Sequence, residues 1–133
     1  MSARRASQLK PILIVEDDAT FGELLVANLA AHGYRSEIAP SVEEAIDQLG
    51  RGLRPSLVLL DINLPGDTGW ALMKGDSLAR AGDPPVVAIS AIPANPRRLA
   101  QYHLAGYLPK PFAMETLRST IERLLSKQGR DIS

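Results

Sequence analysis

The run Leu57–Gly66 constrains the fold of this chain more than any other segment. Its first residues, Leu57–Leu60, are apolar, and Asp61 and then turn-forming residues follow at once. A short apolar run bounded by turn signals is typical of a strand buried in a parallel sheet. Asp61 would then lie at the carboxyl edge of the sheet, where open α/β folds bind ligands. Taken alone, an Asp in this place is more often a turn former or a helix cap, so one run does not establish a site.

Three further apolar runs also end on polar groups: at Glu16–Asp18, at Ser90 and at Lys110. Helical patterns separate the runs, and a more polar run at 34–39 suits an edge strand. Five strand–helix units predict an α/β fold with a doubly wound parallel sheet, helices on both faces and the strand order 2-1-3-4-5. In that order the ends of the first and third strands are neighbours, so the acids, the hydroxyl and the lysine meet at one edge.

The expected strands are 12–15, 34–39, 57–60, 86–90 and 107–109. The first helix carries apolar residues at helical spacing, namely Phe21, Leu24, Leu25 and Leu29, and Gly33 follows as its cap. Ser41 opens the second helix with a capping box, and we expect the inward-facing residues of that helix to be Ala45, Ile46 and Leu49. The remaining helices are expected over 69–80, within 95–105, and over a final segment that ends near residue 127 and carries Leu117, Ile121, Leu124 and Leu125.

Composition narrows the class of protein. A chain of 133 residues with 45% hydrophobic residues suits one domain, which we place at 10–127, between a disordered leader at 1–9 and a short tail at 128–133. Fifteen basic and fifteen acidic residues leave no global field for nucleic acid or anionic lipid. The absence of cysteine excludes disulfides and thiolate sites and suits a cytoplasmic location. No apolar stretch is long enough to span a bilayer.

The strand-end cluster suggests phosphoryl transfer. Two carboxylates about 4 Å apart repel by about 4 kcal/mol at an effective dielectric constant near 20, so a cation is expected between them. Oxygen ligands without histidine or cysteine favour Mg²⁺, or Ca²⁺ or Mn²⁺, over zinc. Lys110 adds a charge that can meet a phosphoryl group, and Ser90 adds a hydroxyl donor. Together they predict transfer onto a carboxylate, with Asp61 as the nucleophile. Glu16–Asp18 could instead simply start a helix, an alternative that weighs most for Asp18.

From about residue 10 to residue 127 the chain resembles the receiver domain of bacterial two-component response regulators, which has a flavodoxin-like fold. The resemblance rests on four motifs: Ile-Leu-Ile-Val-Glu-Asp-Asp at 12–18, Leu-Leu-Asp-Ile-Asn-Leu-Pro-Gly at 59–66, Ser-Ala at 90–91 and Tyr-Leu-Pro-Lys-Pro-Phe at 107–112.

The resemblance implies a role for each matched residue. It implies that Asp61 is the phosphoacceptor, Lys110 the phosphate-binding lysine, and Ser90 and Tyr107 the switch residues. The implied Mg²⁺ ligands are Glu16, Asp17, Asp61 and the backbone carbonyl of Asn63. Lys110 and Pro111 resemble the cis peptide of the family, and X-Pro bonds are the ones that tolerate cis.

Two departures from the family pattern affect the fourth helix. The segment before Tyr107 is about two residues shorter than usual, and Pro93 and Pro96 occupy the usual helix start. Because proline is tolerated only in a first turn, this helix should begin late and be short. Gly75, inside the expected helix 69–80, should cost about 1 kcal/mol relative to alanine.

The expected function is that of a stand-alone receiver, phosphorylated on Asp61 with Mg²⁺ by a histidine kinase or histidine phosphotransfer protein. It would act as a protein-binding switch through the helix 4–strand 5–helix 5 face. It would catalyse only its own phosphorylation and dephosphorylation, with no direct nucleic-acid contact and no membrane insertion.

Three alternative functions fit the sequence less well. A small phosphatase of the haloacid dehalogenase type needs a second Asp where this chain has Asn63. A nucleotide-binding module needs a glycine-rich phosphate loop, and none follows a strand here. A non-phosphorylatable receiver-like module would lack some of the acids, the lysine or the acceptor, all of which are present.

Overall fold

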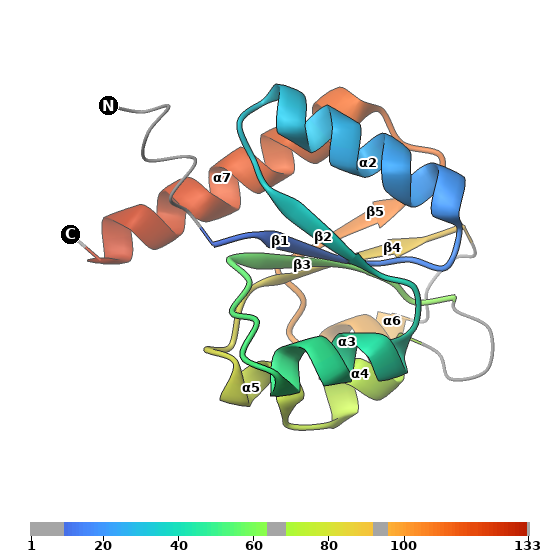
Figure 1. The fold of residues 1–133 in the computed structure, drawn as a ribbon, viewed down its shortest axis with the longest axis vertical. Helices are drawn as coiled ribbons and strands as arrows, with labels where there is room; N and C mark the ends of the chain where they lie inside the picture. Colours follow the sequence, from blue (N-terminus) through green and yellow to red (C-terminus); the bar gives the residue numbers. More distant parts are fainter. Residues whose placement is uncertain (1–9, 64–68, 92–95, 133) are drawn as a thin grey trace.

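The computed structural model describes residues 10–63, 69–91 and 96–132. Its strands form one five-stranded sheet in the order β2-β1-β3-β4-β5, and every neighbouring pair is parallel (Figure 1). The predicted fold class and strand order are therefore confirmed. The strands are β1 Ile12–Val15, β2 Ser36–Ala39, β3 Leu57–Asp61, β4 Val86–Ser90 and β5 Gly106–Pro109.

Helices cover both faces of the sheet (Figure 1). On one face lie α2 (Ala19–Ala31) and α7 (Met114–Ile132); on the other lie α3 (Val42–Gly50), α4 (Trp70–Lys74), α5 (Ser77–Arg80) and α6 (Pro96–Gln101). Successive side chains of a strand point into two buried clusters, one on each face of the sheet. In β3, Leu57 and Leu59 belong to one cluster, and Val58 and Leu60 belong to the other. Burial on both faces explains why these strands are apolar throughout.

The starts of two helices and the end of one follow the predicted local signals. The side chain of Ser41 accepts a hydrogen bond from the backbone N–H of Glu44 at the start of α3, as its capping motif predicts. Asp18 caps α2 in the same way, accepting from the N–H of Phe21. Gly33, just after the end of α2, has a φ of 86°, a left-handed conformation that favours glycine.

The single helix predicted over 69–80 is wrong, because the structure has two short helices there. The break falls at Gly75, which is extended with a ψ of −174° and ends α4 before Ser77 begins α5. Glycine has the highest backbone entropy to lose in a helix, so an interruption is least costly at this position. The predicted weakness at Gly75 was in the right place, but it ends the helix.

Ile46 was predicted to face inward and is instead 42% exposed. The buried residues of α3 are Val42, Ala45 and Leu49. Ile46 follows Ala45 by about 100° around the helix axis, which places it at the edge of the buried stripe.

The remaining differences concern the residues at which helices begin and end. The last helix continues to Ile132 beyond the predicted end near residue 127, because nothing in 128–132 is a proline and Gly129 alone does not end it. The helix predicted within 95–105 is α6. It begins at Pro96 and has six residues, which confirms the predicted late start and short length. Pro93 lies outside the described residues. Among the helices described, none is both long and apolar enough to cross a bilayer.

Candidate functional site

Three carboxylates meet at the carboxyl edge of the central strands. Asp61 is the last residue of β3 and is 5% exposed, whereas Glu16, just after β1, is 2% exposed. Asp17 is exposed at the rim of the same group. One carboxylate oxygen from each of the three lies within 4.8 Å of the others. The strand order therefore brings together the acids that the sequence singled out.

Lys110, which directly follows β5, contacts two of these carboxylates. Its Nζ lies 3.0 Å from Oε1 of Glu16 and 3.4 Å from Oδ2 of Asp61. Its backbone N–H donates to the carbonyl of Ser90, which places the lysine just beyond the end of β5. The predicted cis peptide between Lys110 and Pro111 is confirmed.

The charges of the group do not balance without a further cation. Burial and the neighbouring Asp61 raise the pKa of Glu16 to about 7, although the hydrogen bond from Lys110 opposes the shift. Burial alone would lower the pKa of Lys110, but hydrogen bonds and charge from Glu16 and Asp61 outweigh it and the pKa is raised. One ammonium against three carboxylates leaves an all-oxygen, anionic cluster, which fits a hard divalent cation such as Mg²⁺.

Asn63 links the acid cluster to Ser90. Its backbone N–H donates to Oδ1 of Asp61 at 2.9 Å, and its side-chain amide donates to Oγ of Ser90. Ser90 ends β4 and is 1% exposed. Tyr107 lies on β5 in register with Ala88, is half-buried, and packs against the core on the α3 side of the sheet.

Asp18 has a different role from its two neighbours. It is exposed, it caps α2, and its backbone N–H donates to Oε2 of Glu16 at 3.2 Å. The helix-start interpretation is therefore correct for Asp18.

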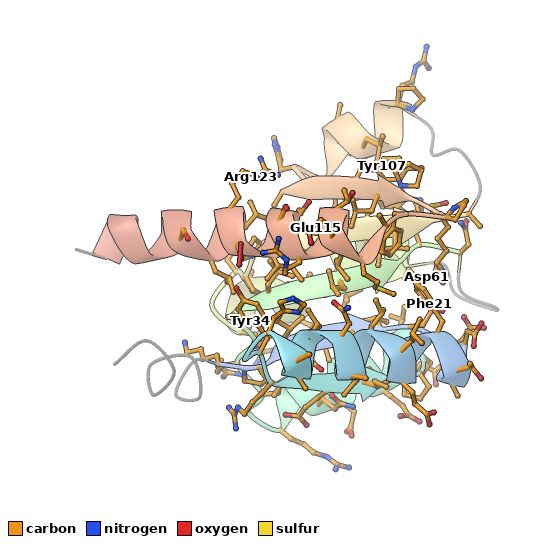
Figure 2. The ribbon with its side chains drawn as sticks, turned by 90° about the horizontal axis from the view of Figure 1, so that it is seen from above. Phe21, Tyr34, Asp61, Tyr107, Glu115 and Arg123 are labelled. Carbon is orange, nitrogen blue, oxygen red and sulfur yellow. The ribbon has the colours of Figure 1, made fainter. Side chains whose placement is uncertain are left out.

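Two residues beside the site were not singled out from the sequence. The Nζ of Lys110 lies 4.5 Å from the centre of the Phe21 ring, and Figure 2 shows Phe21 and Asp61 at the same end of the molecule. Gly69 packs so closely on the acceptor strand that a Cβ there would lie 2.6 Å from the carbonyl oxygen of Asp61. Apolar spacing explained Phe21 as part of its helix, and Gly69 was predicted only as the first residue of the helix over 69–80. Only the position of Phe21 three residues after a cap pointed toward this edge.

Comparison with known proteins places the chain in a family. The model of the response regulator receiver domain matches residues 12–122. The chain belongs to this family. As a receiver domain it is a regulatory module of two-component response regulators, and the phosphatase alternative has no support.

Curated relatives of this receiver domain are longer than the chain. The transcriptional activator protein PfeR of Pseudomonas aeruginosa is 36% identical over 118 residues, which are 87% of this chain and 38% of that protein. The response regulator MprA of Mycobacterium sp. (strain KMS) is 33% identical over 123 residues, 90% of this chain and 52% of that protein. The chain thus spans about half or less of these relatives. Because one of them is a transcriptional activator, the expectation of no nucleic-acid contact has no support.

A solved receiver structure matches over most of its length. The response regulator TrrA of Thermotoga maritima, in complex with Mg²⁺-BeF, has a TM-score of 0.75 and 28% identity, covering 87% of this chain and 99% of that one.

Proposed function

We propose that this receiver domain accepts a phosphoryl group on Asp61, with Mg²⁺ held by Glu16, Asp17, Asp61 and the backbone carbonyl of Asn63. The observation that carries the proposal is the meeting of three carboxylates and Lys110 at one sheet edge. The Mg²⁺-BeF complex of TrrA, a protein of the same fold, supports it. The phosphoryl donor is a histidine kinase or a histidine phosphotransfer protein.

In this proposal Asp61 is the nucleophile. A carboxylate oxygen of Asp61 forms a bond to phosphorus as the bond from phosphorus to the donor nitrogen breaks, and the donor keeps that electron pair. The N–H of Asn63 holds Oδ1 of Asp61, and Nζ of Lys110 lies beside Oδ2. Mg²⁺, when bound, neutralises charge that develops on the phosphoryl oxygens.

Lys110 and Ser90 then respond to the new group. At rest Lys110 pairs with both Glu16 and Asp61, and its ammonium can transfer one contact to a phosphoryl oxygen with little movement. The hydroxyl of Ser90, now bonded to Asn63, is the donor placed to detect the phosphoryl group from β4. Tyr107 on the neighbouring β5 would carry the change to the surface.

The domain is proposed to be a binding switch, catalysing only its own phosphorylation and dephosphorylation. Its output surface would be the face made by α6, β5 and α7, which is the helix 4–strand 5–helix 5 face of the sequence prediction.

The proposal is tested by finding which residue is phosphorylated. Protein incubated with acetyl phosphate and Mg²⁺ should gain the mass of one phosphoryl group, and Asp61→Asn should gain none. Asp18→Asn is the matched control, because Asp18 lies outside the cluster and Asn is also a good helix cap. Labelling that persists in Asp61→Asn would refute the assignment.

A further inference from the structure

We propose that Phe21 is a positioning residue for Lys110: the face of its ring holds the ammonium group at the carboxylate cluster, where the lysine meets an incoming phosphoryl group. The inference rests on the proposed phosphorylation of Asp61. It assigns a role in the site to an aromatic side chain on α2 that apolar spacing explains only as part of the core.

The geometry is that of a cation–π contact. Nζ of Lys110 lies over the Phe21 ring, 4.5 Å from its centre, within the distance at which a cation is attracted to an aromatic face. The same Nζ lies 3.0 Å from Glu16 and 3.4 Å from Asp61. The ammonium group therefore has carboxylates on one side and the ring on another, and the lysine side chain is 24% exposed.

Phe21 is itself held in place from three directions. Asp18 accepts its backbone N–H at 3.1 Å and so fixes the first turn of α2. The next residue, Gly22, is buried, and a Cβ there would lie 3.2 Å from Ile38, so α2 lies close to the sheet at this point. The ring of Phe112 packs edge to face against that of Phe21, with the ring centres 6.0 Å apart and 76° between the ring planes.

The ring gives Lys110 what an aliphatic side chain would not. A flexible four-carbon stem allows many positions of the ammonium group, and carboxylates on one side alone would not select among them. An aromatic face adds a second attraction for the charge and offers no hydrogen bond that would compete with a phosphoryl oxygen. Lys110 can therefore exchange its contact with Asp61 for one with the phosphoryl group while its contact with Phe21 persists.

The test is a series that changes the ring's electrostatics and not its shape. Mono-, di- and trifluorinated phenylalanine placed at position 21 progressively weaken the attraction of the face for a cation. We expect the rate of phosphorylation at saturating acetyl phosphate and Mg²⁺ to fall stepwise, by about threefold to tenfold at trifluorophenylalanine. The same series at position 34, in place of Tyr34 beyond the far end of α2 from Phe21, is the control and should change the rate by less than about twofold.

A second measurement needs no phosphorylation. In the resting protein the ring current of Phe21 should shift the Hε signals of Lys110 upfield, and Phe21→Leu should abolish the shift. Rates that are flat across the series at position 21, or that fall equally at position 34, would overturn the inference while leaving the proposed function intact. An unshifted Lys110 in the wild-type protein would also overturn it. A wild-type protein that is not labelled at all would instead overturn the proposed function, whatever the ring-current shift.

Discussion

Gly69 shows how closely the acceptor strand is supported by the backbone around it. Its N–H donates to the carbonyl of Ile62, and the missing side chain lets it lie against Asp61 and Ile62. A Cβ at this position would lie 2.6 Å from the oxygen of Asp61 and 2.7 Å from Cα of Ile62, which is closer than such atoms approach in proteins. Because both neighbours are backbone, the strand end itself would have to move.

Gly69→Ala should therefore destabilise the protein by about 1–3 kcal/mol, the usual cost of overpacking, and slow phosphorylation of Asp61. Urea unfolding gives the first quantity and the rate of mass gain the second. Gly50→Ala is the control: it lies at the end of α3 with nothing within 4 Å of an added Cβ, and it should be neutral or stabilising. Equal stability of the two variants would contradict the close approach at Gly69.

Glu16 makes the metal-free protein sensitive to pH. Burial and Asp61 raise its pKa to about 7 in the folded protein, from an ordinary value of 4.5. Between these pH values the folded state keeps a proton that the unfolded state has released. The free energy of unfolding should thus be highest below about pH 4.5 for this group and fall as pH rises to 7, by about 3 kcal/mol at most.

Glu16→Gln tests this contribution, because glutamine stays neutral over the whole range. Urea unfolding in EDTA at several pH values should show a steeper loss of stability between pH 5 and 7 for wild type than for the variant. Parallel curves would show that Glu16 ionises in the folded protein as freely as in the unfolded chain.

At the scale of elements, α6 is a short helix with few contacts to the neighbouring helices and strands. It spans six residues from Pro96, so few of its backbone groups are paired within the helix. An aromatic contact joins the end of α6 to the core. The ring of Tyr102, just after α6, stacks on the ring of Trp70 of α4, with the ring centres 5.1 Å apart and 22° between the ring planes. A helix with few internal bonds opens locally at low free energy.

Hydrogen exchange should consequently be at least about tenfold faster in 97–101 than in α2, and it should slow when beryllofluoride and Mg²⁺ are added. The slowing follows if Ser90 and Tyr107 transmit the state of Asp61 to this side of the sheet. Exchange measured by mass spectrometry, with Asp61→Asn as the unresponsive control, checks both statements. Uniformly slow exchange with and without beryllofluoride would contradict them.

At the scale of the whole molecule, the sequence predicted most of what depends on strand burial and strand order. Uninterrupted apolar runs require a sheet covered on both faces, and right-handed connections then leave few strand orders. The order predicted among them, 2-1-3-4-5, joins Glu16, Asp61 and Lys110. What it missed has two causes. Ile46 lies at the edge of the buried stripe of α3, and Gly75 ends a helix that was predicted to continue, so both are local errors about one helix. The contact of Phe21 with Lys110 follows from how α2 packs on the sheet, which periodicity along one helix does not contain.

Mg²⁺ should link the site to the stability of the whole domain. A cation that binds only the folded state raises the free energy of unfolding, by about 2.7 kcal/mol at a concentration 100 times its Kd. Because protons compete for Glu16, the gain should be larger at pH 8 than at pH 6.

Asp17→Asn should remove most of the gain, since Asp17 is one of the three clustered acids. Asp18→Asn should keep it, because Asp18 caps α2 outside the cluster and asparagine caps equally well. Thermal or urea unfolding with and without Mg²⁺ measures the gain in stability at each pH and in each variant. The reverse result, with the gain lost in Asp18→Asn and kept in Asp17→Asn, would place the metal ligands one residue further along the chain.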